Sequence, residues 1–518
     1  MTDRSQFASN LGVAGGTLAS RLTGLARLIV FAAVIGQSAL ADAFDVGNNA
    51  PNVIYELLLG GTLTAVLVPL FVAHRERGDR DGTAAVFGTG LIALGIVTAV
   101  AVVAAPAIFR LYALSPAGDA AAFHAVGSAL TRVFLLQIFF YGLNAMAAGV
   151  LNANGRFLAA AWAPVASNLV AIGALLGMRN DPSIAEFTLD AARSDSRLFW
   201  WFSLGPTLGI AAMAVVVMFV AIGAGVLPRP VFSPRHPAVR DLFRVSGWAI
   251  GYIAANQVAL VVVKNLADPG SGRLDAYAKA MTIFQLPHGL LAVTIVTTTA
   301  PLLARAAAQH EHGEFVRRFV VGARTTVALT LLPAIAMLTF AEPIVRLLLG
   351  WGAFDSGAVT TTARALGGMG IGLVGFSLYL FALRGFYSHG DTRTPFLINI
   401  GQNLLNIALA IALAGRYDYT GIICRGISVY GYAVETIIDR MRQGVLQSFR
   451  RHARVGGYES QHGRHIGMNH AGALGDTRNV AGSAVERKSM IDQLRFRIRG
   501  HNGPGGSSPA MFIEAAQR

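Results

Sequence analysis

The chain of 518 residues is 54% hydrophobic and only 14% charged, and its formal net charge is +14. Soluble globular domains are about 45–50% apolar and about 25% charged, so this composition excludes an ordinary soluble domain, a disordered chain and a coiled coil. Long runs at 91–108, 208–227 and 248–263 are almost free of charge, and about 20 such residues span a bilayer as a helix. The sequence therefore predicts an all-α polytopic membrane protein.

Eleven apolar segments are predicted to be membrane helices, and a twelfth is expected after them. In chain order they lie near 11–35, 50–73, 84–109, 124–151, 157–178, 199–227, 242–266, 276–306, 320–341, 359–388 and 395–414. Several of them exceed 20 residues, which permits a tilt without fixing its angle.

The first segment is predicted to be a retained helix rather than a cleaved signal peptide, because Arg21 and Arg27 interrupt its apolar run. Small residues recur in it every four positions, at Gly12, Gly16, Ser20 and Gly24. Such a stripe allows another helix to approach closely in a membrane. We therefore expect a second helix to pack along this face.

Arg21 and Arg27 are candidate binding residues for an anionic substrate. Arg21 lies about 15 Å from the start of its segment at the helical rise, and an arginine at that depth faces water, protein or an anion. The alternative is snorkelling to the interface, which suits Arg21 poorly. Ser20 beside them is a weaker candidate. Asp42, placed just after this helix, either pairs with one of the arginines or is a solvated loop acid.

Further candidates lie in the second and eighth segments. Glu56 in the second segment is a candidate buried charge. Lys264 and Lys279, two of only three lysines in the chain, flank a loop, and Lys279 either faces the cavity or snorkels to the interface. Pro287 and Gly289 are expected to break or bend the eighth helix, as happens at transport sites.

Basic residues in the loops indicate the orientation of the chain. One set of connections carries fourteen of them and the opposite set ten, so the N-terminus is expected in the cytoplasm. The loop around 181–195 then lies outside and the proline-rich segment 227–237 inside. The same rule accounts for the positive charge, so no nucleic acid partner is expected.

No catalytic or metal-binding motif stands out in the sequence. The single cysteine, Cys424, excludes an internal disulfide framework and a multi-cysteine metal site. No HExxH, GxSxG or Walker loop appears. We expect neither an enzyme nor a bound cofactor.

A long-range repeat indicates a duplicated bundle. Four matches share an offset near 235, and six helices fit in that interval, so both copies keep one orientation and a cavity for alternating access lies between them. Coincidence among apolar helices is the alternative. The matching pairs are Pro106–Leu111 with Pro343–Leu347, Asn154-Gly155 with His389-Gly390, Asn168-Leu169 with Asn403-Leu404, and Pro69–Arg75 with Pro301–Arg305.

These patterns predict an N-lobe of six helices at 1–227, a cytoplasmic linker at 228–240 and a C-lobe with helices seven to eleven at 241–415. Residues 416–518 hold 15 Lys and Arg against 8 Asp and Glu. Four charges fall within 421–441, where the twelfth helix is due, and each costs about 2.5–3.5 kcal/mol at the bilayer centre. The tail is therefore expected to be disordered, or a misframed gene end that has lost this helix. The alternative is a true basic tail that binds anionic lipid.

With these residues in view, the sequence resembles the MurJ/MviN-type lipid II flippases of the MOP exporter superfamily, over roughly residues 8–421. The resemblance implies two six-helix lobes related by a pseudo-twofold axis, and functional roles for Arg21, Arg27 and Asp42. The segments that carry it are Ser20–Arg27, Ala41–Phe44, Pro51-Asn52, Leu151–Phe157, Glu342–Arg346, Gly352–Phe354 and Asp391–Pro395.

The chain departs from the family pattern at two places. Tyr55, Glu56 and Gly60 stand where relatives carry paired arginines and an acid. Thr282 stands where the eighth helix of relatives carries an arginine, which leaves Lys279 as the nearest cation.

The resemblance implies a flippase that moves undecaprenyl-linked peptidoglycan precursor across the cytoplasmic membrane of a bacterium. The substrate is then a lipid-linked anionic glycan, surrounded by membrane lipids. Coupling to an ion gradient or the membrane potential and association with cell-wall synthesis or division proteins are left open. The alternatives are an exporter of the same superfamily with another substrate, such as a drug, a cation or a different lipid-linked glycan, and a non-transporting scaffold or regulator of wall synthesis.

Overall fold

The computed structural model describes residues 3–59, 71–74, 76–237, 239, 255–391 and 393–414. Residues 71–74 and 255–266 are helical. The labelled α-helices are α1 (Asp3–Ile35), α2 (Ala39–Leu59), α4 (Arg80–Val103), α5 (Ala105–Tyr112), α6 (Ala120–Leu135), α7 (Gln137–Ala153), α8 (Leu158–Arg179), α9 (Leu189–Ser194), α10 (Ser196–Gly223), α12 (Arg273–Pro287), α13 (Val293–Ala308), α14 (His312–Thr339), α15 (Ala341–Leu349), α16 (Ser356–Tyr387) and α17 (Arg393–Ala414). Two short helices complete them, the 3-10 helix η1 (Pro182–Glu186) and the π-helix η2 (His288–Ala292).

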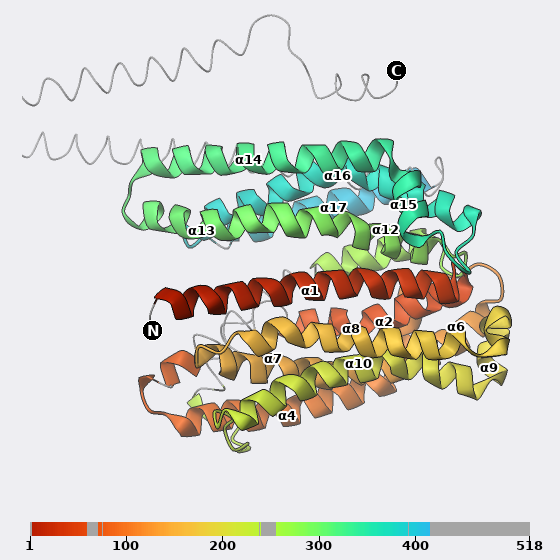
Figure 1. Ribbon diagram of the computed structural model, residues 1–518, viewed down its shortest axis with the longest axis horizontal. Coiled ribbons are helices and arrows are strands. Elements are labelled where there is room, and N and C mark those ends of the chain that lie inside the picture. The colour runs from red at the N-terminus through yellow and green to blue at the C-terminus, as the bar shows by residue number, and fades with distance from the viewer. Residues whose placement is uncertain are drawn as a thin grey trace, which may run out of the picture. The chain divides into compact units, whose positions relative to one another are not determined.

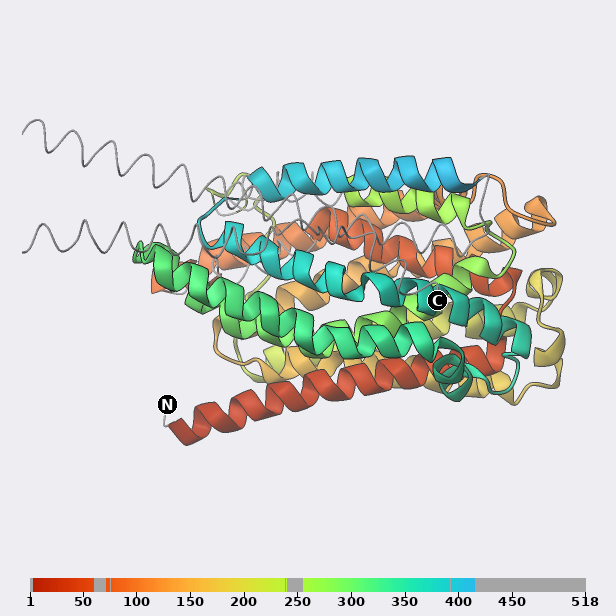
Figure 2. The ribbon, with the colours of Figure 1, turned by 90° about the horizontal axis from the view of Figure 1, so that it is seen from above.

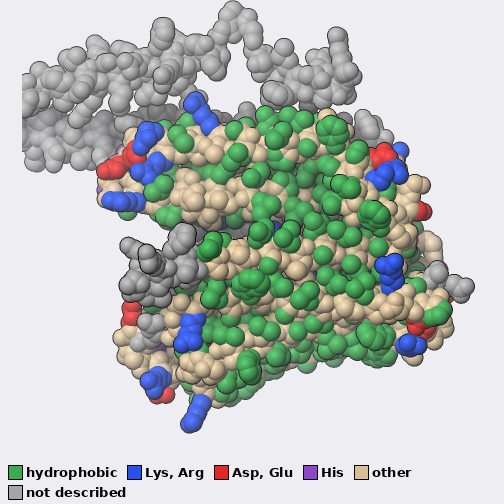
Figure 3. All heavy atoms as spheres, viewed as in Figure 1, with side chains coloured by type: hydrophobic (Ala, Val, Ile, Leu, Met, Phe, Trp, Pro, Cys, Tyr) green, Lys and Arg blue, Asp and Glu red, His purple; other side chains and the backbone are tan. Residues whose placement is uncertain are grey.

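Nine helices in the described part of the chain are long and apolar enough to cross a membrane. They coincide with nine of the eleven predicted segments, and the other two, at 50–73 and 242–266, lie partly outside the described residues. On the face shown in Figure 3, hydrophobic side chains cover the middle, whereas charged side chains gather at the two ends. A bilayer requires this distribution, so the prediction of an all-α polytopic membrane protein is confirmed.

The helices pack as two bundles, which are coloured red to yellow and green to blue in Figure 1. In the first bundle, α1 to α10, the main contacts join α8 with α10 and α1, and α2 with α6. In the second bundle, α12 to α17, α16 packs against α14 and α12, and α13 against α14. The first bundle reaches the second through α1 and α2, since α1 contacts α12 and α15, and α2 contacts α12.

The same order of elements occurs in both bundles. A long helix, a short helix and another long helix follow one another as α4, α5 and α6, and again as α14, α15 and α16. The turns after α7 and α16 both end on a glycine with positive φ, Gly155 at 73° and Gly390 at 72°. Asn168 of α8 and Asn403 of α17 occupy matching helices. These pairs fall at the offset that the sequence repeat predicts.

The stripe of small residues on α1 packs against α8, as predicted. A Cβ atom at Gly12 would lie 2.6 Å from the Leu158 side chain, and one at Gly16 would lie 2.7 Å from Trp162 and 3.1 Å from the Ala161 backbone. At Gly16 the Trp162 ring and the Ala161 backbone leave no room for a Cβ atom, whereas at Gly12 only the end of the Leu158 side chain would have to move.

Replacing Gly16 by leucine is expected to destabilise the first bundle by about 1–3 kcal/mol, the usual cost of overpacking. Gly15 provides the matched control, because it is exposed and a Cβ atom there meets Trp162 only at 4.0 Å. The thermal unfolding midpoint in detergent should fall for Gly16→Leu and stay near the parent value for Gly15→Leu. Equal midpoints for the two variants would contradict this packing.

The second helix begins earlier than its hydropathy predicts. The expected segment was 50–73, whereas α2 begins at Ala39, where the Ser38 hydroxyl accepts a hydrogen bond from the Ala41 backbone N–H at 3.2 Å. Asp42 and Asp45 lower the hydropathy of this first part, although both lie inside the helix. The prediction of Asp42 as a loop residue is therefore wrong.

The eighth membrane segment is interrupted, as its Pro287 and Gly289 predict. The helix α12 ends at Pro287, the π-helix η2 follows, and α13 continues from Val293. His288 of η2 is hydrogen-bonded to the Ser377 hydroxyl of α16 at 2.9 Å. Single π-turns inside α-helices occur often at functional sites.

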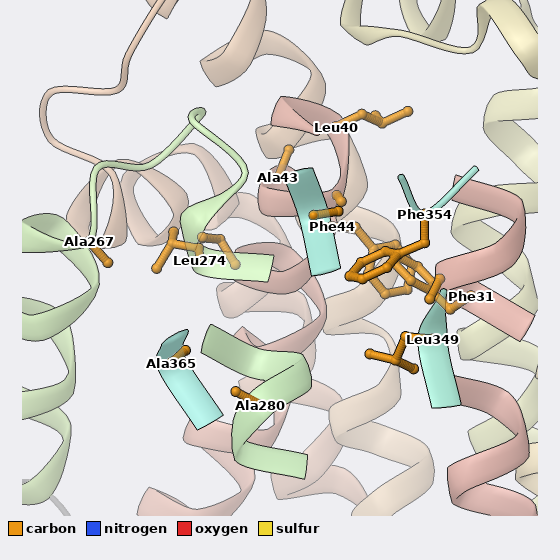
Figure 4. Close-up of a cluster of buried hydrophobic side chains, with 14 of the residues drawn as sticks. Phe31, Leu40, Ala43, Phe44, Ala267, Leu274, Ala280, Leu349, Phe354 and Ala365 are labelled. Carbon is orange, nitrogen blue, oxygen red and sulfur yellow. The ribbon is translucent and has the colours of Figure 1, made fainter. Parts of the chain in front are cut away.

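An aromatic core lies where the two bundles meet. The rings of Phe31 of α1 and Phe44 of α2 are tilted by 44° with centroids 4.7 Å apart, and the Phe44 ring lies at the same distance from Phe202 of α10. The second bundle contributes Leu349 and Phe354, both buried, and Figure 4 shows Phe354 beside Phe31. Dense packing of this kind resists separation of the bundles.

Candidate functional site

Asp42 joins the two bundles by binding the N-terminus of α12. Its Oδ2 atom accepts hydrogen bonds from the backbone N–H groups of Gly270 at 2.9 Å and Gly272 at 2.8 Å, and its Oδ1 atom accepts one from Asp275 at 2.8 Å. The side chain is fully buried. A carboxylate at a helix N-terminus is stabilised by the unpaired N–H groups and by the helix dipole. Asp42 is therefore not a solvated loop acid, and no arginine among the described residues is bound to it.

Further hydrogen bonds, from the backbone and from one side chain, close the same end of the bundles. Ala353 donates a hydrogen bond to the Ala33 carbonyl at 2.9 Å. Asn265, from the helix 255–266, accepts one from the Leu114 N–H at 2.7 Å and donates one to the Leu111 carbonyl at 2.9 Å. We call the end that holds these residues the closed end; it lies at the right of the bundles in Figures 1 and 2.

A cavity of about 140 Å³ lies between the bundles, next to the closed end. Polar and charged side chains line it together with aromatic rings. Its polar residues come from α1, α2 and α12, and they are Arg27, Asp45, Asn48, Asp275, Lys279 and Thr282. The rings of Phe31, Phe44 and Phe202 form part of its wall. The cavity thus combines both signs of charge in a largely apolar enclosure, where electrostatic interactions are strong.

Lys279 is buried between the bundles. Its side chain pairs with Asp275 one turn earlier in α12, and both residues are 1% exposed. The ammonium group also lies over the rings of Phe31 at 4.9 Å and Phe354 at 5.5 Å from their centroids. Lys279 therefore does not snorkel to the membrane interface. It lines the cavity, which was the alternative prediction for this residue.

Arg21 and Arg27 occupy different places. Arg27 lines the cavity beside Lys279. Arg21 lies on α1 further from the closed end than Arg27. It reaches the second bundle, since a Cβ atom at Gly289 would lie 2.7 Å from the Arg21 Cζ atom. A glycine in η2 thus leaves room for the guanidinium group. Ser20 beside Arg21 accepts a hydrogen bond at its carbonyl from the Asn168 side chain at 3.1 Å, so its backbone contributes to helix packing.

The remaining predicted residues are Lys264 and Glu56. Lys264 is 8% exposed and its ammonium group lies over the Tyr112 ring at 5.3 Å, near the closed end. Glu56 lies in α2, but its side chain and that of Tyr55 are outside the described part of the chain, and so is Gly60 as a whole. Their binding roles stay predictions.

Three residues of the cavity are not predicted from the sequence, namely Asp45, Asn48 and Asp275. Asp45 and Asn48 follow Asp42 at steps of three residues, which places all of them on one side of a helix. This spacing would have identified them had the region been assigned to a helix rather than a loop. Asp275 lies four residues before Lys279, a spacing that favours an ion pair.

Two helix bundles that cross the membrane and enclose a charged cavity, sealed at one end by contacts between them, define an alternating-access membrane transporter. A family model described as lipid II flippase MurJ matches residues 31–446. The chain belongs to this family.

Curated relatives agree with this assignment. The lipid II flippase MurJ of Burkholderia cenocepacia is 30% identical over 404 residues, which cover 76% of each chain. A probable lipid II flippase MurJ of Rhizobium meliloti is 31% identical over 416 residues, 79% of this chain and 76% of the relative.

Solved structures show the same fold. A lipid II flippase MurJ in an inward closed conformation superposes with a TM-score of 0.70 at 19% identity, covering 83% of this chain and 87% of that one. An inward-facing MATE multidrug resistance transporter of the MOP superfamily superposes with a TM-score of 0.67 at 15% identity, covering 83% of this chain and 96% of the transporter. The predicted MOP exporter fold is confirmed.

One expectation about the end of the chain is wrong. The family likeness was expected to stop near Gly421, but the family model matches through residue 446. The charged segment 421–441 therefore belongs to the matched region. Residues 422–518, for which a misframed or disordered end is predicted, lie outside the described residues, so this stays a prediction.

Proposed function

We propose that this chain moves lipid II, the undecaprenyl-linked peptidoglycan precursor, across the bacterial cytoplasmic membrane by alternating access. The observation that carries the proposal is the cavity that holds Arg27 and Lys279 between the two bundles, in a chain of the MurJ family.

The chemistry of the cavity suits a pyrophosphate group. A guanidinium group such as that of Arg27 binds phosphate oxygens through two parallel hydrogen bonds, which are stronger than bonds between neutral groups. Lys279 would add a second cation once it separates from Asp275. An exporter of organic cations would instead need acids that are not neutralised by neighbouring cations, so this alternative is not favoured.

The size of the cavity supports alternating access. Pockets for drug-sized ligands measure about 300–1,000 Å³, whereas this cavity measures about 140 Å³. The headgroup of lipid II is larger than a typical drug, so the bundles must separate before it enters. The closed end then remains sealed by Asp42 while the opposite end admits the substrate.

The orientation follows from the loop charges. With fourteen basic residues on one side and ten on the other, the N-terminus is proposed to lie in the cytoplasm. The closed end then faces outward, and the conformation described is closed to the outside. Transport is expected to draw on an ion gradient or the membrane potential, without catalysis or a cofactor. Association with cell-wall synthesis or division proteins is part of the hypothesis.

Reconstituted vesicles test the proposal. The purified chain should speed the transfer of fluorescent lipid II between leaflets well above the rate in protein-free vesicles. A fluorescent undecaprenyl-linked glycan of another kind and a cationic drug serve as comparison substrates. Equal rates with and without protein, or faster transfer of either comparison substrate, would contradict the proposed function.

A further inference from the structure

The two acids of the cavity come from different bundles and face each other. Asp45 lies on α2 and Asp275 on α12, and their carboxyl groups are within hydrogen-bonding range. Both line the cavity. In each, the Oδ2 atom is buried and has no hydrogen-bond partner among the described residues.

An ionised carboxylate only accepts hydrogen bonds, so two ionised groups in this position would repel each other and leave their buried oxygen atoms unpaired. One proton shared between the two groups removes both problems, because a protonated carboxyl donates a hydrogen bond. Asp275 is 1% exposed, so water outside the protein does not stabilise its charge in this conformation.

We propose that Asp45 and Asp275 share one proton when the closed end is sealed, and that they form a proton-binding site which exists only in this conformation. When the bundles separate at the closed end, α2 and α12 carry the two carboxyl groups apart into water and the proton leaves. Closing this end takes up one proton from water.

The surrounding charges are consistent with a proton as the ligand. The charged groups that face the pair are Arg27 from α1, Asp42 from α2, Lys264 from the helix 255–266 and Lys279 from α12. With one proton on the pair, these side chains and the pair together carry a net charge of +1. The closed cavity would therefore favour an anion, a link to transport that rests on the proposed function. Within the described residues, no group of three or more His, Cys, Asp or Glu side chains forms a metal site.

A proton that is bound only in the closed conformation makes closing depend on pH. Since the closed state holds one more proton than the open state, lower pH favours the closed state. The ratio of closed to open molecules rises by up to about tenfold for each unit by which the pH falls. Replacing either acid by asparagine removes this dependence, because a carboxamide donates an N–H to the remaining carboxylate without taking up a proton.

Spin labels across the closed end measure this ratio. Ser115 of the first bundle and Ser271 of the second are exposed, and the single cysteine, Cys424, is replaced by serine. Distances between labels on Ser115→Cys and Ser271→Cys are measured by double electron–electron resonance in lipid nanodiscs, across roughly pH 5 to 9, where buried carboxyl groups titrate. We expect the short-distance population to rise as the pH falls, and to be independent of pH in Asp45→Asn and Asp275→Asn.

Asp119→Asn is the matched control. Asp119 is an exposed acid near the closed end that caps α6 within the first bundle, so its variant should keep the full pH dependence. The proposal is overturned if the parent shows no pH dependence, if both asparagine variants keep it, or if sodium concentration at fixed pH changes the ratio and the same variants abolish that response.

Infrared spectroscopy keeps the test decisive if a variant fails to fold. The parent at neutral pH should show the C=O stretch of a buried carboxylic acid that exchanges slowly with deuterium, and its absence overturns the proposal. None of these measurements uses lipid II. A failed flipping assay and a missing pH response are therefore separate results.

Discussion

Replacing Arg27 by alanine is expected to slow lipid II flipping in reconstituted vesicles by roughly ten- to hundredfold. Of the two cations among the described residues that line the cavity, Lys279 is paired with Asp275, whereas Arg27 faces the cavity. A hydrogen bond to a charged group contributes about 1.5–3 kcal/mol, and each 1.4 kcal/mol changes an equilibrium constant about tenfold. Arg27→Lys should recover only part of the rate, because lysine loses the two parallel hydrogen bonds.

Arg346→Ala is the matched control for the cavity arginine. Arg346 is exposed and pairs with Glu342 on α15 at 2.7 Å, and such surface pairs contribute about 0–1 kcal/mol. Its variant should flip lipid II at nearly the parent rate. If Arg27→Ala were as active as Arg346→Ala at equal protein levels, Arg27 would not bind the substrate.

Asp42→Ala is expected to shift the closed end towards the open state and to lower the flipping rate at least tenfold. The substitution leaves the N–H groups of Gly270, Gly272 and Asp275 without their acceptor. An unpaired buried donor costs about 1–3 kcal/mol, so the closed state loses several kcal/mol unless the bundles separate and admit water. The labels at Ser115 and Ser271 should then report longer distances at every pH.

Asp119→Ala distinguishes this effect from the loss of an ordinary helix cap. Asp119 accepts a hydrogen bond from Ala122 at 2.9 Å within its own bundle, so its removal costs about 1 kcal/mol of local stability without releasing the other bundle. A short label distance that persists in Asp42→Ala would show that Asp42 does not hold the closed end.

Hydropathy and small-residue spacing predicted much of the fold, because both act within one helix. The apolar run of α1 and its stripe ending at Gly24 identify a membrane helix and the face that meets α8. The offset near 235 residues identified the duplication, since each bundle repeats the same order of elements. Pro287 and Gly289 predicted the interruption of the eighth segment, because they too act on the helix in which they lie.

The site could not be predicted as fully, because it depends on which surfaces of the two bundles meet. Asp42 and Asp45 look like loop acids when judged by hydropathy, and only α12 on the other side explains their presence in a membrane helix. Lys279 has the spacing of an ion pair with Asp275, but its burial against Phe31 and Phe354 arises from three separate segments. Pairing between distant segments leaves no periodic pattern in the chain.

The interruption at η2 has a mechanical consequence. A π-turn lacks one turn of regular α-helical hydrogen bonds and is a place where a helix bends. Here it divides one membrane span into α12, which Asp42 holds at the closed end, and α13, which leads to the opposite end. A bend at η2 would change the angle between α12 and α13 while the hydrogen bonds of Asp42 to the start of α12 stay in place. We therefore expect the opposite end to open by bending at η2, without breaking the seal at the closed end.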